Sequence, residues 1–148
     1  MVYVVADHGG FKKKQLLLAR LRRRGLPVRD LGPASLQTKD DYPIWAARLA
    51  RLLQSDRRGR GLALCRSGVG MAIAANKFPG LRAVQGWSVP VARASRREEN
   101  SNLLSLAADH QSLADMERIV MTWWQTPYRP VKRFQRRLRE ISRLEHER

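Results

Sequence analysis

The residues best suited to chemistry in this chain lie at positions 62–77, where an apolar run ends at Cys65 and a glycine loop follows. The run is typical of a buried parallel strand, and Gly68 and Gly70 interrupt the chain before a helix of small residues. In open α/β sheets, ligands bind beyond the carboxyl ends of the strands. Glycines there let backbone N–H groups approach an anion, and a helix N-terminus adds partial positive charge.

Cys65 is the only cysteine of the chain, and it stands where the predicted strand meets the loop. A thiol among backbone amides favours its thiolate form, so Cys65 is a candidate base or nucleophile. The alternative is that Cys65 is a small hydrophobic residue of the core. The loop by itself leaves both interpretations open.

Composition limits the class of protein. The 148 residues suit one domain, and a hydrophobic content of 43% indicates a globular fold. A single cysteine excludes a disulfide framework within the chain and is compatible with a reducing cytoplasm, where we expect the protein to reside. Met1 leads into a short apolar run with no basic lead, so we expect no signal peptide. No segment reaches the roughly 20 apolar residues of a membrane span.

The charge is strongly basic, with 29 Lys and Arg against 13 acidic residues and a formal net charge of +16. Arginines cluster at residues 22–24, 57–60 and 96–97 and in the tail after Pro130. Such a balance attracts polyanions, including nucleic acids. The basic residues are nevertheless dispersed and few aromatics lie among them, which favours a solvated arginine-rich surface.

Strand and helix patterns alternate along the chain. We predict strands over residues 2–6, 27–31, 62–65, 81–85 and 103–106. An exposed basic helix is predicted over residues 11–24, and the apolar side of the next helix includes Ile44. The predicted helices cover residues 11–24, 42–54, 89–99, 111–125 and 131–147, with a shorter helix from the glycine loop to Pro79. The pattern indicates an α/β domain, a three-layer sandwich with about five parallel strands and helices on both faces.

The last predicted helix follows Pro127 and Pro130 and carries a narrow apolar stripe. A helix of this kind beyond a proline hinge packs either on a partner subunit or on its own domain, and the pattern fits both equally. The stripe consists of Val131, Phe134, Leu138, Ile141 and Leu144.

Three motifs together resemble the type-B ribose-5-phosphate isomerases, which are grouped with the galactose-6-phosphate isomerase subunits. They are the Asp-His-Gly-Gly-Phe sequence at residues 7–11, the Asp-Tyr-Pro sequence at 41–43, and the segment from Cys65 to Ala83 with its Ala-Ala-Asn-Lys helix. The resemblance extends from Met1 to about Ile141 without a large gap.

The resemblance implies a Rossmann-like or flavodoxin-like sandwich that works as a homodimer or tetramer, with the active site between subunits. It divides the chain into an α/β core, residues 1–126, and a C-terminal dimerisation and phosphate-binding helix, residues 127–148. The implied reaction is an aldose–ketose isomerisation of a sugar phosphate, foremost ribose 5-phosphate to ribulose 5-phosphate. It uses no metal and no cofactor.

The resemblance also assigns catalytic roles around the loop. Cys65 is the base that moves a proton between C1 and C2 through an enediolate, and Ser67 forms hydrogen bonds near that proton. The backbone amides of Gly68, Val69 and Gly70 stabilise the developing oxyanion.

Further residues are implied to bind the substrate. Asp7 and His8 contact the sugar hydroxyls or the ring oxygen, and Tyr42 is a third contact. Arg133 and Arg137 lie four positions apart on one helical face and match the phosphate-binding arginines that a partner chain supplies.

The chain departs from the family pattern at several positions. Glu98 and Glu99 stand where a His-Asn pair is usual for ring opening, and Asp109 stands where an arginine is usual. A carboxylate at Glu98 can still accept a proton, so Glu98 stays a catalytic candidate. Arg66 replaces a glycine and could offset the added negative charge or bind phosphate itself.

Four interpretations follow from these departures: a competent homodimeric isomerase, an isomerase with an altered substrate, one subunit of a hetero-oligomer with a paralogous partner, or a protein without activity. A different class of function is a binding protein that holds a polyanion on the same fold.

Overall fold

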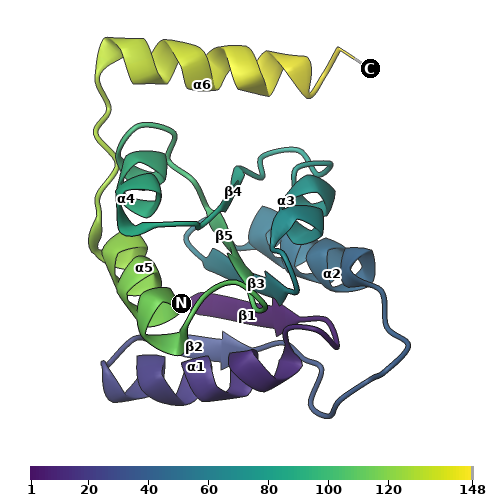
Figure 1. Cartoon of the computed structure of the whole chain (residues 1–148). Coiled ribbons are helices and arrows are strands. Elements are labelled where there is room, and N and C mark those ends of the chain that lie inside the picture. Colours follow the sequence, from purple (N-terminus) through teal and green to yellow (C-terminus); the bar gives the residue numbers. More distant parts are fainter. Residues whose placement is uncertain (148) are drawn as a thin grey trace.

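The computed structural model describes residues 1–147 (Figure 1). Its centre is one five-stranded sheet in the order β2-β1-β3-β5-β4, and every neighbouring pair is parallel. The predicted five-stranded parallel sheet is therefore confirmed. The strands are β1 (Val2–Ala6), β2 (Val28–Asp30), β3 (Arg60–Cys65), β4 (Ala83–Gln85) and β5 (Leu103–Ala107).

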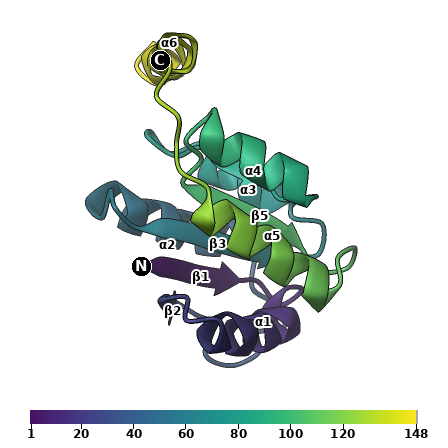
Figure 2. The same cartoon turned by 90° about the vertical axis from the view of Figure 1, so that its left-hand side faces the viewer.

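Helices cover both faces of the sheet, which makes the predicted three-layer sandwich. Residues of α2 and α3 pack in one core cluster, and residues of α1, α4 and α5 pack in the other (Figure 2). The helices are α1 (Phe11–Arg23), α2 (Tyr42–Ser55), α3 (Val69–Ala75), α4 (Val89–Arg97), α5 (Leu113–Gln125) and α6 (Lys132–Leu144).

The central strands are buried on both faces because their side chains alternate between two apolar layers. In β3, Leu62 and Leu64 face α1, α4 and α5, whereas Ala63 and Cys65 face α2 and α3. All five residues of β1 are likewise buried. A continuous apolar run is what a parallel strand covered on both faces requires, and this explains why β1 and β3 could be recognised from the sequence.

Several predicted boundaries differ from the structure by two residues or more, and β3 and α3 show the physical reasons. Strand β3 begins at Arg60, two residues before the predicted start at residue 62, because the Arg60 N–H donates to the Met1 carbonyl (N···O 3.1 Å) and extends the ladder. Helix α3 ends at Ala75, well before Pro79. The Asn76 side chain stops it by accepting from the Ala83 N–H (2.7 Å) and donating to the Ala83 carbonyl (2.9 Å), which ties the helix end to β4.

The prediction of an exposed α1 was wrong for one of its faces. Leu17 and Leu18 are buried in the core together with Lys14, whose Nζ reaches the Asp30 carboxylate at 2.7 Å and the Pro33 carbonyl at 2.9 Å. The two hydrogen bonds compensate for burying the ammonium group. In α2, Ile44 was placed on the apolar side but is 65% exposed.

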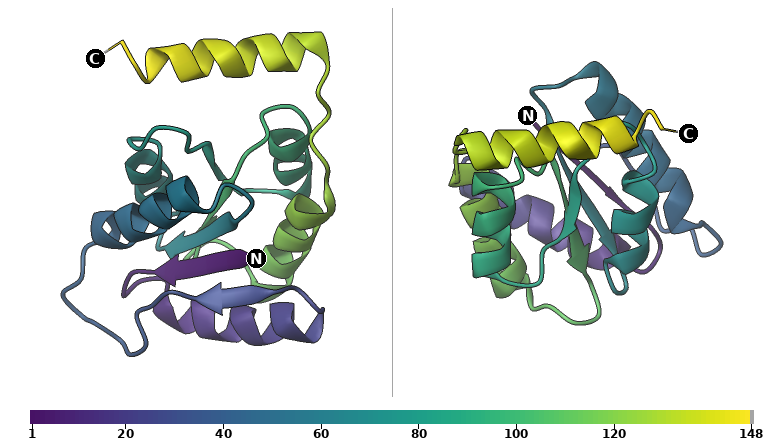
Figure 3. Two further views of the ribbon diagram at one scale, coloured as in Figure 1. Left: turned by 180° about the vertical axis from the view of Figure 1, so that it is seen from behind. Right: turned by 90° about the horizontal axis from the view of Figure 1, so that it is seen from above.

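Helix α6 lies apart from the body of the molecule, at the end opposite α1 (Figure 1, Figure 3). Within its apolar stripe, Phe134 is buried, whereas Ile141 and Leu144 are 40% and 63% exposed. The Glu145 carboxylate accepts a hydrogen bond from the Gly80 N–H at 2.9 Å, which links the end of the helix to the core. Part of the stripe is thus left uncovered by this chain.

Candidate active site

The carboxyl ends of β1, β3 and β5 bring several predicted site residues together. Ala6 of β1 pairs with Leu64 of β3, so the loop that begins at Asp7 lies beside Cys65. The Ala108 N–H then donates to the Cys65 carbonyl at 2.8 Å, which joins the end of β5 to the same place. Neighbouring strand ends at the centre of a parallel sheet are the usual position of a ligand site in such folds.

The Cys65 side chain is 4% exposed, and its sulfur accepts a hydrogen bond from the Gly68 N–H (N···Sγ 3.1 Å). Gly68 has a φ of 76°, and a Cβ at this position would lie 3.1 Å from the Leu106 carbonyl carbon. Both the backbone conformation and the space therefore favour glycine. The Gly68 amide is thus directed at the sulfur of the single cysteine in the sequence.

The loop after Cys65 is held by further hydrogen bonds. The Val69 N–H donates to the Ser67 hydroxyl at 3.3 Å, and the Ser105 hydroxyl donates to the Gly68 carbonyl at 2.6 Å. The Gln85 side-chain amide donates to the Ser67 carbonyl. Two of the three amides predicted to bind an oxyanion, those of Gly68 and Val69, thus donate within the loop in this structure.

Tyr42 reaches the same loop from the start of α2. A Cβ on Gly70 would lie 2.6 Å from the Cζ atom of Tyr42, so the aromatic ring rests directly against this glycine. Tyr42 is 41% exposed, so it lies beside the loop and remains open to solvent.

Asp7 is 5% exposed, and its carboxylate accepts a hydrogen bond from the Gly10 N–H at 2.9 Å. Burial raises the pKa of Asp7, although this hydrogen bond opposes the shift. The stem of Arg66 passes close by, because a Cβ on Gly9 would lie 2.6 Å from the Arg66 Cγ. The Asp7 carboxylate and the Arg66 stem thus both lie beside Gly9.

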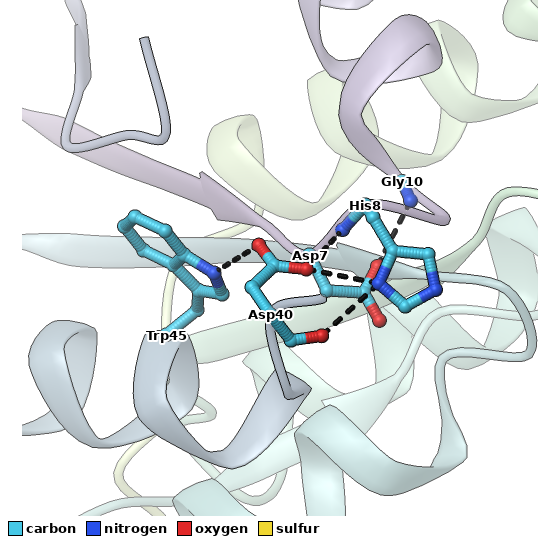
Figure 4. A network of polar contacts seen from close by, with 5 residues as sticks. All are labelled: Asp7, His8, Gly10, Asp40 and Trp45. Atoms are coloured by element: carbon cyan, nitrogen blue, oxygen red, sulfur yellow. Dashed lines mark hydrogen bonds and ion pairs between the residues drawn. The ribbon is translucent and has the colours of Figure 1, made fainter. Parts of the chain in front are cut away.

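His8 is held by a carboxylate that the sequence analysis missed, that of Asp40 (Figure 4). The Asp40 Oδ1 atom accepts from the His8 backbone N–H at 2.8 Å and lies 2.9 Å from His8 Nδ1. The Asp40 carbonyl lies 3.0 Å from the same ring nitrogen, and the Trp45 indole N–H donates to Asp40 Oδ2 at 2.6 Å. Both partners of Nδ1 are acceptors, so Nδ1 carries a proton.

The pairing shifts the pKa of both His8 and Asp40. The hydrogen bonds with Asp40 raise the pKa of His8 above its ordinary value. Burial acts to raise the pKa of Asp40, but the hydrogen bonds from His8 and Trp45 outweigh burial and hold the pKa below the usual range. Both shifts favour a protonated imidazole beside an ionised carboxylate.

Arg66 and Asp109, two of the departures from the family pattern, form an ion pair at the site edge. The distance between Arg66 Nη1 and Asp109 Oδ2 is 3.4 Å, and both side chains are largely exposed. An exposed pair of this kind adds little stability. The positive charge of Arg66 partly neutralises the negative charge of Asp109 at this edge of the site.

A second group of predicted residues lies elsewhere in the chain. Glu98 caps α4 and forms an ion pair with Arg97. The hydrogen bond from Arg97 lowers the pKa of Glu98, and the positive charges of Arg133 and Arg137 lower it further. The four side chains therefore form one cluster, which we call the Glu98 group.

No hydrogen bond or ion pair within residues 1–147 joins the Glu98 group to the residues around Cys65. In Figure 1, β1 and β3 point towards the right, whereas the linker to α6 rises on the left. One chain therefore presents two separate clusters of predicted site residues. Over the same described residues, no group of three or more His, Cys, Asp or Glu side chains is arranged to hold a metal.

The family model described as Ribose/Galactose Isomerase matches residues 2–141 of the chain. The chain belongs to this family. The ribose-5-phosphate isomerase B of Mycolicibacterium paratuberculosis is 35% identical over 144 residues, covering 97% of this chain and 91% of the relative. That of Escherichia coli is 34% identical over 142 residues, covering 96% and 94%.

Solved structures agree with this assignment. Ribose-5-phosphate isomerase B from Mycoplasma genitalium with bound ribulose 5-phosphate superposes with a TM-score of 0.92 at 30% identity, covering 99% of this chain and 97% of that one. The type B enzyme of Trypanosoma brucei gives 0.91 at 34% identity, with 97% of each chain covered. The family resemblance, the α/β fold and the expectation of an isomerase are thus confirmed. Within residues 1–147, no helix has the length and apolar character to span a membrane.

Proposed function

We propose that this protein is an aldose–ketose isomerase that converts ribose 5-phosphate to ribulose 5-phosphate, with Cys65 as the base. The observation that carries the proposal is the hydrogen bond from the Gly68 amide to the Cys65 sulfur, at the carboxyl end of a central strand. It is supported by full-length relatives named ribose-5-phosphate isomerase B, one of them solved with bound ribulose 5-phosphate.

In the proposed reaction the Cys65 thiolate removes the proton from C2 of the open-chain aldose. The electron pair forms the C1–C2 double bond of an enediolate, and negative charge develops on the carbonyl oxygen. The Gly70 amide, in the first turn of α3, stabilises that charge, and the amides of Gly68 and Val69 contribute when they turn from Cys65 and Ser67 to the substrate oxygen. Cys65 then returns a proton to C1 while the O2 hydroxyl proton passes to O1, with Ser67 as the adjacent hydrogen-bonding group, so that the ketose forms with no net change of atoms.

We infer that a second copy of the chain completes the site. Arg133 and Arg137 suit a phosphate because guanidinium groups bind its oxygens in a bidentate manner. They belong to the Glu98 group, which has no hydrogen bond or ion pair to the residues around Cys65 within residues 1–147 of its own chain. A homodimer in which the Glu98 group of one subunit faces the Cys65 loop of the other brings phosphate binding and proton transfer together.

The deciding experiment is an isomerisation assay of the purified protein with ribose 5-phosphate, following ribulose 5-phosphate. The wild type should turn over, and Cys65→Ala should lose at least about a hundredfold in kcat because the base is gone. Thermal unfolding of the variant should be cooperative, which separates loss of chemistry from loss of fold.

A second measurement uses the chain's single cysteine. Iodoacetamide should label only Cys65, and ribose 5-phosphate should slow that labelling. Wild-type activity in Cys65→Ala, or labelling that substrate does not affect, would contradict the role of Cys65. An inactive wild type would instead favour a hetero-oligomeric subunit or a non-catalytic protein.

A further inference from the structure

We propose that His8 is the proton donor that opens the furanose ring of the substrate, and that Asp40 is the positioning residue that holds His8 for this step. The inference rests on the proposed function, because ring opening must precede the enediolate step when the sugar arrives as a ring.

The geometry points to this role. Asp40 fixes both the backbone N–H and the Nδ1–H of His8, and Trp45 fixes Asp40 from its other oxygen. In Figure 4 the second ring nitrogen, Nε2, lies on the side of the imidazole away from Asp40. A carboxylate that holds one nitrogen of a histidine leaves the other nitrogen oriented for proton transfer.

His8 also lies at the correct edge of the sheet. It follows the end of β1, and the pairing of Ala6 with Leu64 places that end beside the end of β3, which carries Cys65. The His8 side chain is 36% exposed, whereas that of Asp40 is only 10% exposed. The imidazole of His8 is thus accessible to both substrate and solvent, while Asp40, which holds it, is mostly buried.

Glu98 is poorly suited to donate this proton. Its ion pair with Arg97 and the nearby charges of Arg133 and Arg137 lower its pKa, so Glu98 is a carboxylate at neutral pH. A carboxylate can accept a proton but has none to give. His8, whose pKa is raised by its hydrogen bonds with Asp40, carries a proton on both nitrogens over a wider range of pH.

Ring opening moves one proton from His8 to the sugar and releases one proton from the sugar to water. The Nε2 proton of His8 passes to the ring oxygen as the bond between C1 and that oxygen breaks. The C1 hydroxyl loses its proton to water, and the C1 carbonyl forms. His8 is left as a neutral imidazole with Nδ1–H still bonded to Asp40, and it regains a proton from solvent.

The charged groups that face His8 fix the expected pH dependence. They are Asp40 from the loop before α2 and Asp7 at the end of β1, and the nearby Arg66, whose stem lies against Gly9, directs its guanidinium to Asp109. The two carboxylates favour the imidazolium. Conversion of ribose 5-phosphate should therefore decline as pH rises through the His8 pKa, with a midpoint above the ordinary value of about 6.5.

The experiment separates ring opening from the enediolate step. Ribulose 5-phosphate has no furanose ring because its C5 oxygen carries the phosphate. Exchange of its C1 hydrogen with deuterium from D₂O, followed by NMR, therefore reports the Cys65 step alone. In His8→Gln, conversion of ribose 5-phosphate should fall about a hundredfold while exchange stays within about threefold of the wild type.

Asp40 is tested by its effect on His8. Asp40→Asn should lower the midpoint of the alkaline decline and reduce conversion about tenfold at neutral pH, with exchange preserved. Asp40→Glu should restore part of the conversion. Asp115→Asn, which removes a carboxylate on α5 that pairs with Ser112 and Arg118, should change neither rate nor midpoint.

Three outcomes would overturn the inference. Equal loss of conversion and exchange in His8→Gln would make His8 a binding residue only, and an unshifted midpoint in Asp40→Asn would remove the positioning role. The third outcome needs only the wild type, so it can be read even if a variant does not fold. An alkaline decline that is missing from conversion, or that is equally present in exchange, would show that His8 does not supply the proton for ring opening. A wild type with neither conversion nor exchange would instead overturn the proposed function.

Discussion

Arg133 and Arg137 allow the phosphate assignment to be tested one side chain at a time. Arg133→Ala or Arg137→Ala should each raise KM for ribose 5-phosphate about ten- to hundredfold, the typical effect of losing a charged hydrogen bond. The value of kcat should change little, because the phosphate is held equally in the ground state and the transition state. Initial rates over a range of substrate concentration give both constants.

Arg136→Ala is the matched control on the same helix, since its guanidinium is near Glu140 (Nε···Oε1 3.8 Å). Its kinetics should equal those of the wild type. If all three variants behave alike, the anion binds elsewhere, and Arg66 is the next residue to replace.

Residues with a local signal could be predicted, and residues that depend on distant contacts could not. The position of Cys65 at the end of a strand was predicted correctly, because an apolar run ends there and a glycine loop begins. Asp40 was missed because its partner His8 lies 32 positions away, and only the folded loop before α2 brings them together. The pairing of Arg66 with Asp109 escaped prediction for the same reason, because it joins the ends of two strands.

The loop between β3 and α3 requires glycine at position 68 for two reasons, a positive φ angle and a lack of space for a Cβ. Gly68 and Gly80 have nearly equal positive φ angles, 76° and 80°, but a Cβ at Gly80 would meet nothing within 4 Å. Gly80→Ala should therefore lose about 1 kcal/mol of unfolding free energy from backbone strain alone. Gly68→Ala adds a contact with the Leu106 carbonyl and should lose about 2–3 kcal/mol.

Denaturant unfolding measures both losses, and the isomerisation assay adds a second readout. Gly68→Ala should lower kcat, because the amide that faces Cys65 shifts with the loop, whereas Gly80→Ala should not. Equal stabilities and equal rates in the two variants would show that the loop tolerates a side chain.

The strands were predicted more accurately than the helix ends. A strand buried on both faces has an unbroken apolar sequence, so β1 was found with its correct limits. The end of α3 was misplaced because a side chain decides it: Asn76 binds the backbone of Ala83, a contact between two segments that no periodic pattern records. Similarly, the burial of Lys14 in the basic helix α1 was not predicted, because its partner Asp30 lies 16 positions away.

At the scale of the whole molecule, α6 leaves apolar surface uncovered, and we expect a second subunit to cover it. Ile141→Glu combined with Leu144→Glu should convert the dimer to a monomer at micromolar concentration and lower activity at least tenfold, because charge is introduced into a buried contact. Light scattering coupled to size exclusion gives the mass.

Leu16→Glu is the control for that pair. Leu16 is a similarly exposed leucine, at 55%, on α1 at the opposite end of the molecule. It should leave mass and activity unchanged. A wild type that is already monomeric and active would contradict the shared site.

The separation of Cys65 from the Glu98 group has a genetic consequence. Cys65→Ala and Arg137→Ala damage different halves of a composite site, so each homodimer is defective at both of its sites. A mixed dimer gathers both lesions in one site and leaves the other intact. At substrate concentrations below the wild-type KM, where the loss of Arg137 lowers the rate, unfolding and refolding the two variants together in equal amounts should therefore recover about a quarter of wild-type activity, since half of the dimers are mixed and each has one sound site. Two defective alleles of this gene would complement each other in one cell.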